Sequence, residues 1–207
     1  MRVLTAALAL FVSLSAFAKP IAERADDVSP LLNGQNIPQV NVVTIDNEKK
    51  SLNEFLGNKK TILFFYRGGW CPFCNTQMGQ LKKIEGKLAK MGYQLVGVST
   101  DGPADLKKSV EKLDLQYQLL SDFNSEISQA FGLAFFSSKK VTERYLAAMK
   151  LENPLQKNKA GEERLVLPVP AIYLIDEKGL VQFNYVNPNF KVRLDENVLL
   201  AAAKAAM

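Results

Sequence analysis

One apolar run, TILFFY at residues 61–66, ends only a few residues before a segment with helical periodicity begins. A continuous apolar run rich in β-forming residues is typical of a strand that is buried on both faces, as in a covered parallel sheet. Apolar residues then recur at three- and four-residue steps, which predicts a helix from Cys71 to about Lys90, closed by Gly92. The chain must therefore turn from a buried strand into a helix within the loop RGGW, and this turn constrains the fold most.

The same strand-then-helix order continues along the chain. Strands are predicted at residues 38–46, 61–66, 93–99, 117–122, 171–176 and 180–186, the first as an edge strand and the last two as a hairpin. Helices are predicted at residues 51–57, 71–90, 101–113, 125–133 and 196–206. Ser51 and Glu54 have the spacing of a capping box. Strands that alternate with helices indicate βαβ units and a mostly parallel sheet.

Two segments depart from this pattern. Residues 19–37 have no periodicity and are predicted to be an irregular lead-in to one domain over residues 38–207. Residues near 134–168 combine a helical stretch, VTERYLAAMKLE, with a polar stretch punctuated by Gly and Pro. We expect an insertion near the surface there and not a second domain.

Residues 1–18 have the layout of a secretory signal peptide. Arg2 provides a short basic start, Val3 to Leu14 are mainly apolar, and Ala16-Phe17-Ala18 form an A-x-A cleavage site. The apolar run is shorter than the roughly 20 residues of a permanent membrane anchor, although an uncleaved anchor is the alternative. We expect export, to the periplasm, with cleavage after Ala18 and no stable membrane insertion afterwards.

The charge of the chain gives no sign of a nucleic-acid partner. The formal net charge is +5, and the lysines are spread along helical segments such as QLKKIEGKLAK, between apolar positions. A nucleic-acid footprint would instead cluster basic and aromatic residues on one surface. The basic residues are therefore interpreted as solvated helix faces.

Cys71 and Cys74 are the only cysteines among 207 residues, and the chain has no histidine. A structural zinc site needs about four ligands, typically Cys and His, so a metal site is not expected. A cysteine nucleophile of the protease type needs a histidine base. A structural disulfide remains possible, but it would close a very short loop and restrain little of the unfolded chain. Dithiol redox chemistry is the favoured interpretation.

The predicted position of Cys71 suits this chemistry. The first turn of a helix carries unpaired N–H groups and a partial positive charge, which stabilise a thiolate and lower its pKa. Arg67 would add a positive charge if its side chain folds over the loop. We expect an exposed Cys71 to attack, while Cys74, shielded by Trp70 and the sheet, resolves the product to a Cys71–Cys74 disulfide.

The segments FFYRGGWCPFC and LPVPAIYLIDEKG, with VGVSTDGPADLKKSV and YQLLSD between them, resemble the thioredoxin superfamily. Within it the chain is most similar to the peroxiredoxin-like branch of the AhpC/TSA family, from about Pro38 to the C-terminus. The resemblance implies a thioredoxin-like α/β fold, with a central mostly parallel sheet, an antiparallel hairpin and helices on both faces. It also implies a thiol-dependent oxidoreductase that needs no cofactor.

The resemblance leaves open which substrate oxidises the dithiol. As a peroxiredoxin, the protein would reduce hydroperoxides through Cys71 and Cys74 and depend on a thioredoxin-like reductant. As a thiol–disulfide oxidoreductase, it would act on protein disulfides. A thioredoxin-fold binding module without catalysis is the third possibility.

Further residues near the dithiol follow from the resemblance. Pro170 matches the cis-proline of thioredoxin-like proteins, so a cis Val169–Pro170 bond is expected, and Arg67, Trp70 and Pro170 are expected to position the substrate. Two features of typical peroxiredoxins differ here. Phe64 and Gly68 replace the proline and hydroxyl residue ahead of the reactive cysteine, and Pro170 stands where an arginine is usual. Arg67 and Arg193 are candidates to replace these donors, unless they are merely exposed arginines that aid solubility.

Overall fold

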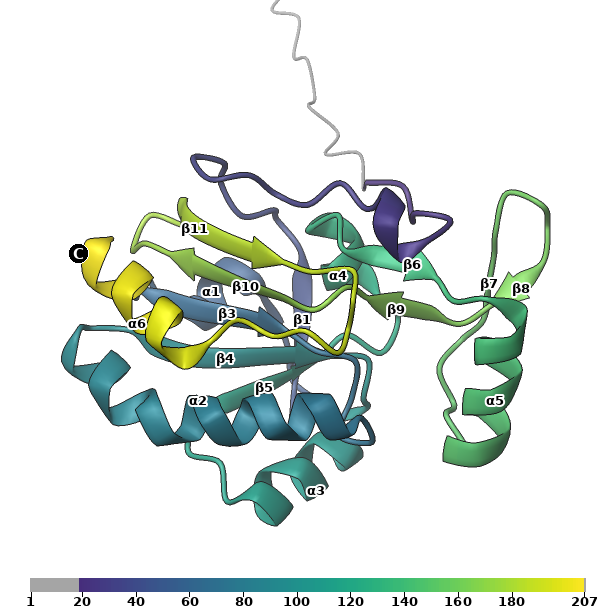
Figure 1. Ribbon diagram of the computed structural model, residues 1–207, viewed down its shortest axis with the longest axis horizontal. Coiled ribbons are helices and arrows are strands. Elements are labelled where there is room, and N and C mark those ends of the chain that lie inside the picture. The colour runs from purple at the N-terminus through teal and green to yellow at the C-terminus, as the bar shows by residue number, and fades with distance from the viewer. Residues whose placement is uncertain (1–18, 207) are drawn as a thin grey trace, which may run out of the picture.

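A mixed β-sheet with helices on both faces forms the body of the protein (Figure 1). The computed structural model describes residues 19–206, so the predicted signal peptide at residues 1–18 lies outside the described residues. The strand order is β11-β10-β3-β4-β5-β1-β2. The strands are β1 (Asn41–Thr44), β2 (Lys49–Ser51), β3 (Thr61–Phe65), β4 (Gln94–Ser99), β5 (Gln118–Ser121), β10 (Ala171–Ile175) and β11 (Val181–Val186). The helices of this body are α1 (Leu52–Leu56), α2 (Pro72–Lys90), α3 (Pro103–Leu113), α4 (Glu126–Ala130) and α6 (Glu196–Ala205).

The parallel pairs lie at the centre of the sheet. Strands β3, β4 and β5 run parallel to one another, and antiparallel strands flank them on both sides. The predicted thioredoxin-like α/β fold, with central parallel strands and an antiparallel hairpin of β10 and β11, is confirmed. The predicted edge position of residues 38–46 is wrong, because β2 pairs along the outer side of β1. The sequence KKS of β2 is too short and polar to signal a strand.

Strand β3 has the burial that its apolar sequence predicts. All five of its residues are buried, and alternate side chains enter the cores on opposite faces of the sheet. One core lies under α2, α3 and α6, and the other lies under α1, α4 and the lead-in at residues 19–37. This lead-in is irregular as predicted, apart from a short 3₁₀ turn at Ala25–Asp27.

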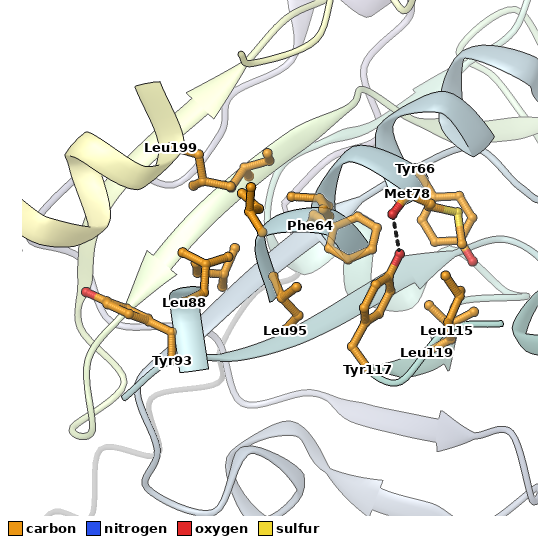
Figure 2. Close-up of a cluster of buried hydrophobic side chains, with 14 of the residues drawn as sticks. Phe64, Tyr66, Met78, Leu88, Tyr93, Leu95, Leu115, Tyr117, Leu119 and Leu199 are labelled. Carbon is orange, nitrogen blue, oxygen red and sulfur yellow. Dashed lines mark hydrogen bonds between the residues drawn. The ribbon is translucent and has the colours of Figure 1, made fainter. Parts of the chain in front are cut away.

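The core under α2 contains a group of aromatic side chains (Figure 2). The ring of Phe64 contacts those of Tyr66 and Tyr117, with centroids 5.7 Å away in both cases. The Tyr117 hydroxyl donates a hydrogen bond to the Met78 carbonyl of α2, at 3.1 Å. A side chain at Gly97 of β4 would begin 2.6 Å from the Phe64 ring, so only glycine fits beside it. Helix α2 is therefore fixed against the C-terminal ends of the parallel strands.

The residues predicted to begin and end helices do so in the structure. The Ser51 hydroxyl accepts a hydrogen bond from the Glu54 backbone N–H, and Gly57 ends α1 with a left-handed conformation. Pro103 occupies the first turn of α3, where backbone N–H groups have no partner within the helix and proline therefore costs no hydrogen bond. Gly92, just beyond α2, has a φ of +85°. No helix among residues 19–206 combines the length and apolar character needed to cross a membrane.

Residues 134–168 contain elements of their own, which project from one side of the sheet (Figure 1). They are β6 (Ala134–Phe136), α5 (Lys139–Met149), β7 (Gln156–Lys157), β8 (Glu163–Arg164) and β9 (Val166–Pro168). Strand β6 pairs with β9, and β7 pairs with β8. Tyr145, Leu165 and Leu167 form a small buried cluster, which we call the insertion core, and Trp70 packs against it. Trp70 also packs against the main core, so it joins the two.

Candidate dithiol active site

The two cysteines lie at the beginning of α2. Cys71 is the N-cap residue, Pro72 is the first helical residue, and Cys74 follows within the first turn. The Cys71 N–H donates to the Gly68 carbonyl, and the Cys74 N–H donates to the Cys71 carbonyl, both at 3.1 Å. The strand-to-helix turn thus places both sulfur atoms at the positive end of the helix, as the sequence predicts.

The two glycines before Trp70 are required by close packing. Gly68 has a φ of +154°, and a side chain there would begin 2.2 Å from the Trp70 indole nitrogen and 2.6 Å from Asp101. A side chain at Gly69 would begin 2.3 Å from the Ser109 hydroxyl. A hydroxyl residue at position 68 therefore has no space, which accounts for its replacement by glycine.

Asp101, just beyond β4, holds this loop from the other side. Its carboxylate accepts a hydrogen bond from the Gly69 N–H at 2.6 Å, and the Asn75 side chain of α2 donates to the Gly69 carbonyl at 2.9 Å. Burial raises the pKa of Asp101 to about 6. Asp101 carries no sequence signal as a site residue, because an aspartate after a strand is common in loops.

The two thiols have opposite electrostatic properties. A hydrogen bond with the Cys74 thiol, together with the charges of Arg67 and Arg193, lowers the pKa of Cys71 to about 6 even though burial opposes this shift. The same thiol–thiol hydrogen bond and the deeper burial raise the pKa of Cys74. Cys71 is therefore the thiolate of the pair, and Cys74 remains a protonated thiol. Both are free cysteines in this structure.

The predicted exposure of Cys71 is wrong. Cys71 is only 2% exposed and Cys74 is fully buried. The loop between β11 and α6 contributes Phe190 and Arg193 at this point: the Arg193 Nη2 lies 3.4 Å from the Cys74 Sγ. The Phe190 ring lies between the guanidinium of Arg67 and the ring of Phe73, at 4.2 and 5.8 Å. A C-terminal segment remote in sequence therefore borders the dithiol: the candidate Arg193 lies beside Cys74, whereas the local pattern around the cysteines gives no sign of Phe190.

Arg67 is also buried, at 3% exposure, so it is not a merely solubilising surface arginine. Its guanidinium lies near three aromatic rings, with centroid distances of 4.2 Å for Phe190, 5.1 Å for Tyr145 and 5.4 Å for Trp70. Its Nη2 donates to the Tyr145 hydroxyl at 2.5 Å, and its Nε has no hydrogen-bond partner in the part of the chain that the structure describes. Arg193 is half-buried, and its Nε likewise lacks a partner. Among residues 19–206, neither arginine forms a salt bridge.

Pro170 lies at the same end of the sheet as the dithiol loop. It directly precedes β10, whose first residue, Ala171, pairs with Phe65 at the end of β3. The expected cis bond before it is wrong, since no peptide bond in the described part of the chain is cis. The Val169 N–H bonds the Leu133 carbonyl at 2.9 Å, so the extended path of β9 continues directly into β10 and the ordinary trans bond suffices.

The surroundings offer neither a metal site nor a second set of thiols. Within residues 19–206, no group of three or more Cys, Asp or Glu side chains is arranged to hold a metal ion. A cavity of about 710 Å³ lies on the α3 side of the loop and is lined by Trp70, Asp101 and Ser109 among others, but not by either cysteine. The chemistry available at the site is therefore that of one thiolate, one thiol and two guanidinium groups.

Known proteins share both the sequence pattern and the fold. The sequence model of the AhpC/TSA family matches residues 33–184. Peroxiredoxin Bcp of Escherichia coli K12 is 31% identical over 106 residues, which are 51% of this chain and 67% of that protein. The chloroplastic peroxiredoxin Q of Populus jackii is 27% identical over 154 residues, or 74% of this chain and 60% of that protein.

Solved structures agree at the level of the fold. Reduced Prx3 of Vibrio vulnificus, solved in complex with H₂O₂, superposes with a TM-score of 0.67 at 17% identity, covering 84% of this chain and 99% of its own. Peroxidoxin BcpB of Mycobacterium tuberculosis gives a TM-score of 0.61 at 18% identity and covers 84% of this chain and 96% of its own.

Proposed function

Because the chain belongs to the AhpC/TSA family and is a peroxiredoxin-like thiol-dependent oxidoreductase, we propose that it reduces hydroperoxides with Cys71 as the attacking residue. The observation that carries this proposal is the pairing of Cys71, whose pKa is lowered to about 6, with the protonated Cys74 thiol beside it. At pH 7 a pKa of about 6 leaves roughly 90% of a thiol ionised, against about 3% for an ordinary cysteine with a pKa near 8.5. Cys71 is thus ready to attack at neutral pH.

In the first step the Cys71 thiolate attacks the terminal oxygen of the hydroperoxide. The S–O bond forms as the O–O bond breaks, and Cys71 becomes a sulfenic acid. The remainder of the hydroperoxide leaves as an alkoxide, or as hydroxide in the case of hydrogen peroxide, and takes up a proton. Gly68 cannot supply the hydroxyl that usually contacts the peroxide. Arg67 and Arg193 provide positive charge next to the sulfur atoms, and we assign them to stabilise the negative charge that moves onto the leaving oxygen.

In the second step Cys74 attacks the sulfenic sulfur of Cys71. A disulfide forms between the two residues, and the sulfenic oxygen leaves as water. An external dithiol of the thioredoxin type then reduces the disulfide by thiol–disulfide exchange. Since Cys71 is 2% exposed, the loop carrying Phe190 and Arg193 must move aside for the peroxide and for this reductant. Trp70, in the loop before Cys71, and Pro170, at the same end of the sheet, are assigned to the surface that receives them.

The N-terminal sequence supports a location outside the cytosol. A basic start, an apolar run and an A-x-A site at residues 16–18 favour export to the periplasm with cleavage after Ala18. In that location the thioredoxin-like reductant must be a periplasmic or membrane-linked dithiol protein. A fusion of residues 1–18 to a reporter that is active only after export tests this: a reporter retained in the cytosol contradicts the proposal.

Stopped-flow oxidation of the reduced protein separates the two candidate substrates. We expect hydrogen peroxide or an alkyl hydroperoxide to oxidise Cys71 faster than free cysteine by more than the roughly 30-fold that ionisation alone provides at pH 7. We expect Cys71→Ser to abolish this reaction, and Cys74→Ser to stop it at the sulfenic acid. Oxidation that is no faster than ionisation allows, together with rapid oxidation by a model disulfide, would instead identify a thiol–disulfide oxidoreductase.

A further inference from the structure

The guanidinium of Arg67 is a buried cation without a carboxylate partner among residues 19–206. Removing a charged group from water is costly unless other groups compensate for the lost hydration. The compensation here comes from three aromatic faces and one hydroxyl group. A cation over an aromatic face is attracted to the ring electrons, which retains the charge but allows it to rotate and slide over the rings.

Within residues 19–206, the Tyr145 hydroxyl is the one directional contact of this guanidinium. The Arg67 Nη2 donates to it at 2.5 Å, whereas Trp70 and Phe190 contribute only ring faces. The hydrogen bond prefers a near-linear geometry, so it determines in which plane the guanidinium lies and how far the side chain extends. Without it, the same charge would remain in the cage with its orientation unspecified.

Tyr145 itself is held by the insertion. It lies on α5, which the Ser138 side chain caps through a hydrogen bond from the Val141 N–H at 3.3 Å. Farther along α5, the Thr142 hydroxyl accepts from the Leu165 N–H at 3.2 Å, which joins the helix to the segment before β9. The Tyr145 ring packs against buried Leu165 and against Trp70, whose centroid is 5.0 Å away. The hydroxyl is therefore presented to Arg67 by a helix that is capped at its beginning and packed against the segment before β9.

We propose that Tyr145 is a positioning residue, which fixes the guanidinium of Arg67 beside the dithiol and so makes the insertion at residues 134–168 part of the active site. The inference rests on the proposed function only in taking Cys71 as the reactive thiol. The groups that act on Cys71 come from three elements: Cys74 from α2, Arg67 from the loop after β3, and Arg193 from the loop before α6. Tyr145 acts on Cys71 only through Arg67.

The conservative variant Tyr145→Phe tests this proposal, with Tyr117→Phe as its matched control. Both changes remove one hydroxyl from a buried tyrosine and leave the ring, but the Tyr117 hydroxyl bonds the Met78 carbonyl, away from Arg67. The measurement is the rate of Cys71 alkylation by iodoacetamide as a function of pH, with the modified residue identified by mass spectrometry. We expect Tyr145→Phe to raise the pKa of Cys71 by about half a unit to one unit and Tyr117→Phe to leave it unchanged.

A double-variant cycle shows whether the effect passes through Arg67. In an Arg67→Met background, Tyr145→Phe should produce no further change in the pKa of Cys71, because the group that it positions is gone. An unchanged pKa in Tyr145→Phe, or an equal shift in both tyrosine variants, would overturn the proposal. So would a full shift in the Arg67→Met background. If Arg67→Met does not fold, the two tyrosine variants still decide the question.

The alkylation readout needs no peroxide and is therefore independent of the proposed peroxidase reaction. A shift confined to Tyr145→Phe in a protein that peroxide oxidises slowly would support the positioning role and refute the hydroperoxide substrate. Fast peroxide oxidation, with no shift in the pKa of Cys71 in Tyr145→Phe, would support the hydroperoxide substrate and refute the positioning role.

Discussion

The two faces of the central sheet and the insertion core differ in what they do for the dithiol. The sheet cores are large, enclose β3 from both sides and fix the beginning of α2 in space. The insertion core is small, and Trp70 and the Tyr145–Arg67 hydrogen bond link it to the dithiol loop. The comparison indicates that the fold places the thiols, whereas the insertion adjusts the charge around them.

The largest effect is expected from damage to the central sheet. Phe64 is fully buried and contacts Tyr66 and Tyr117, so Phe64→Ala removes most of an aromatic side chain from a core that cannot easily collapse around Gly97. We expect a loss of about 3–5 kcal/mol in the free energy of unfolding, measured by urea denaturation. Because the folded fraction should retain its Arg67 contacts, the pKa of Cys71 in that fraction should not change. A change in the pKa would mean that the central core also adjusts the thiol.

Truncating a side chain of the insertion core should have the opposite pattern of effects, with a smaller loss of stability and a changed pKa of Cys71. Leu165 is fully buried against Tyr145, and Leu165→Ala should cost about 2 kcal/mol, at the lower end for a buried leucine, because a small peripheral core can relax around the cavity. We expect increased amide hydrogen exchange in residues 134–168 and a raised pKa of Cys71. Unchanged exchange in the insertion, with a loss of stability as large as that of Phe64→Ala, would show that the two regions unfold as one unit.

The sequence predicts most of the central sheet and its helices, but little of the insertion core. The apolar run of β3, the helical period of α2, and the Ser51 cap follow from local chemistry, and the structure confirms each of them. Tyr145 lies in an ordinary amphipathic stretch, and its hydrogen-bond partner is 78 residues away in the sequence. Phe190 likewise reaches Arg67 from a loop without a motif, in which the sequence indicates only Arg193 as a candidate. Contacts between remote segments leave no periodic signal, so the burial of Cys71 could not be predicted.

The pH dependence of stability offers an intermediate test, through two buried carboxyl groups of the central body. Asp122 caps α4 by accepting hydrogen bonds from the Ile127 and Ser128 N–H groups at 2.7 and 2.9 Å, and burial raises its pKa to about 7. Burial similarly raises the pKa of Asp101, below the dithiol loop, to about 6. An aspartate in the unfolded chain has a pKa of about 3.9. The folded state therefore holds protons that the unfolded state has already released.

It follows that stability should fall as the pH rises from about 4 to 6, by on the order of 1 kcal/mol or more. Above pH 6 the ionisation of Cys71, whose pKa is lowered to about 6, opposes the remaining effect of Asp122. Urea denaturation at several pH values measures this slope. Asp122→Asn should remove a falling contribution over the whole range from about pH 4 to 7, whereas Asp101→Asn should remove one only between about pH 4 and 6. The slope is the diagnostic quantity, since each substitution also changes hydrogen bonding at every pH. Stability that rises over this window in the unsubstituted protein would contradict the assignment.

The smallest expected effects form the most closely matched comparison. Ser51 caps α1 on the central body and Ser138 caps α5 in the insertion, each by accepting one backbone hydrogen bond, at 3.2 and 3.3 Å. Replacing either serine by alanine should cost about 1 kcal/mol of stability. Only Ser138→Ala should also raise the pKa of Cys71, because fraying of α5 loosens Tyr145, whereas α1 has no path to Arg67. Since the two losses of stability are equal by design, a difference in thiol ionisation has to arise from the position of the helix and not from the strength of the cap. Equal alkylation profiles for the two variants would place the control of Cys71 in the central body alone.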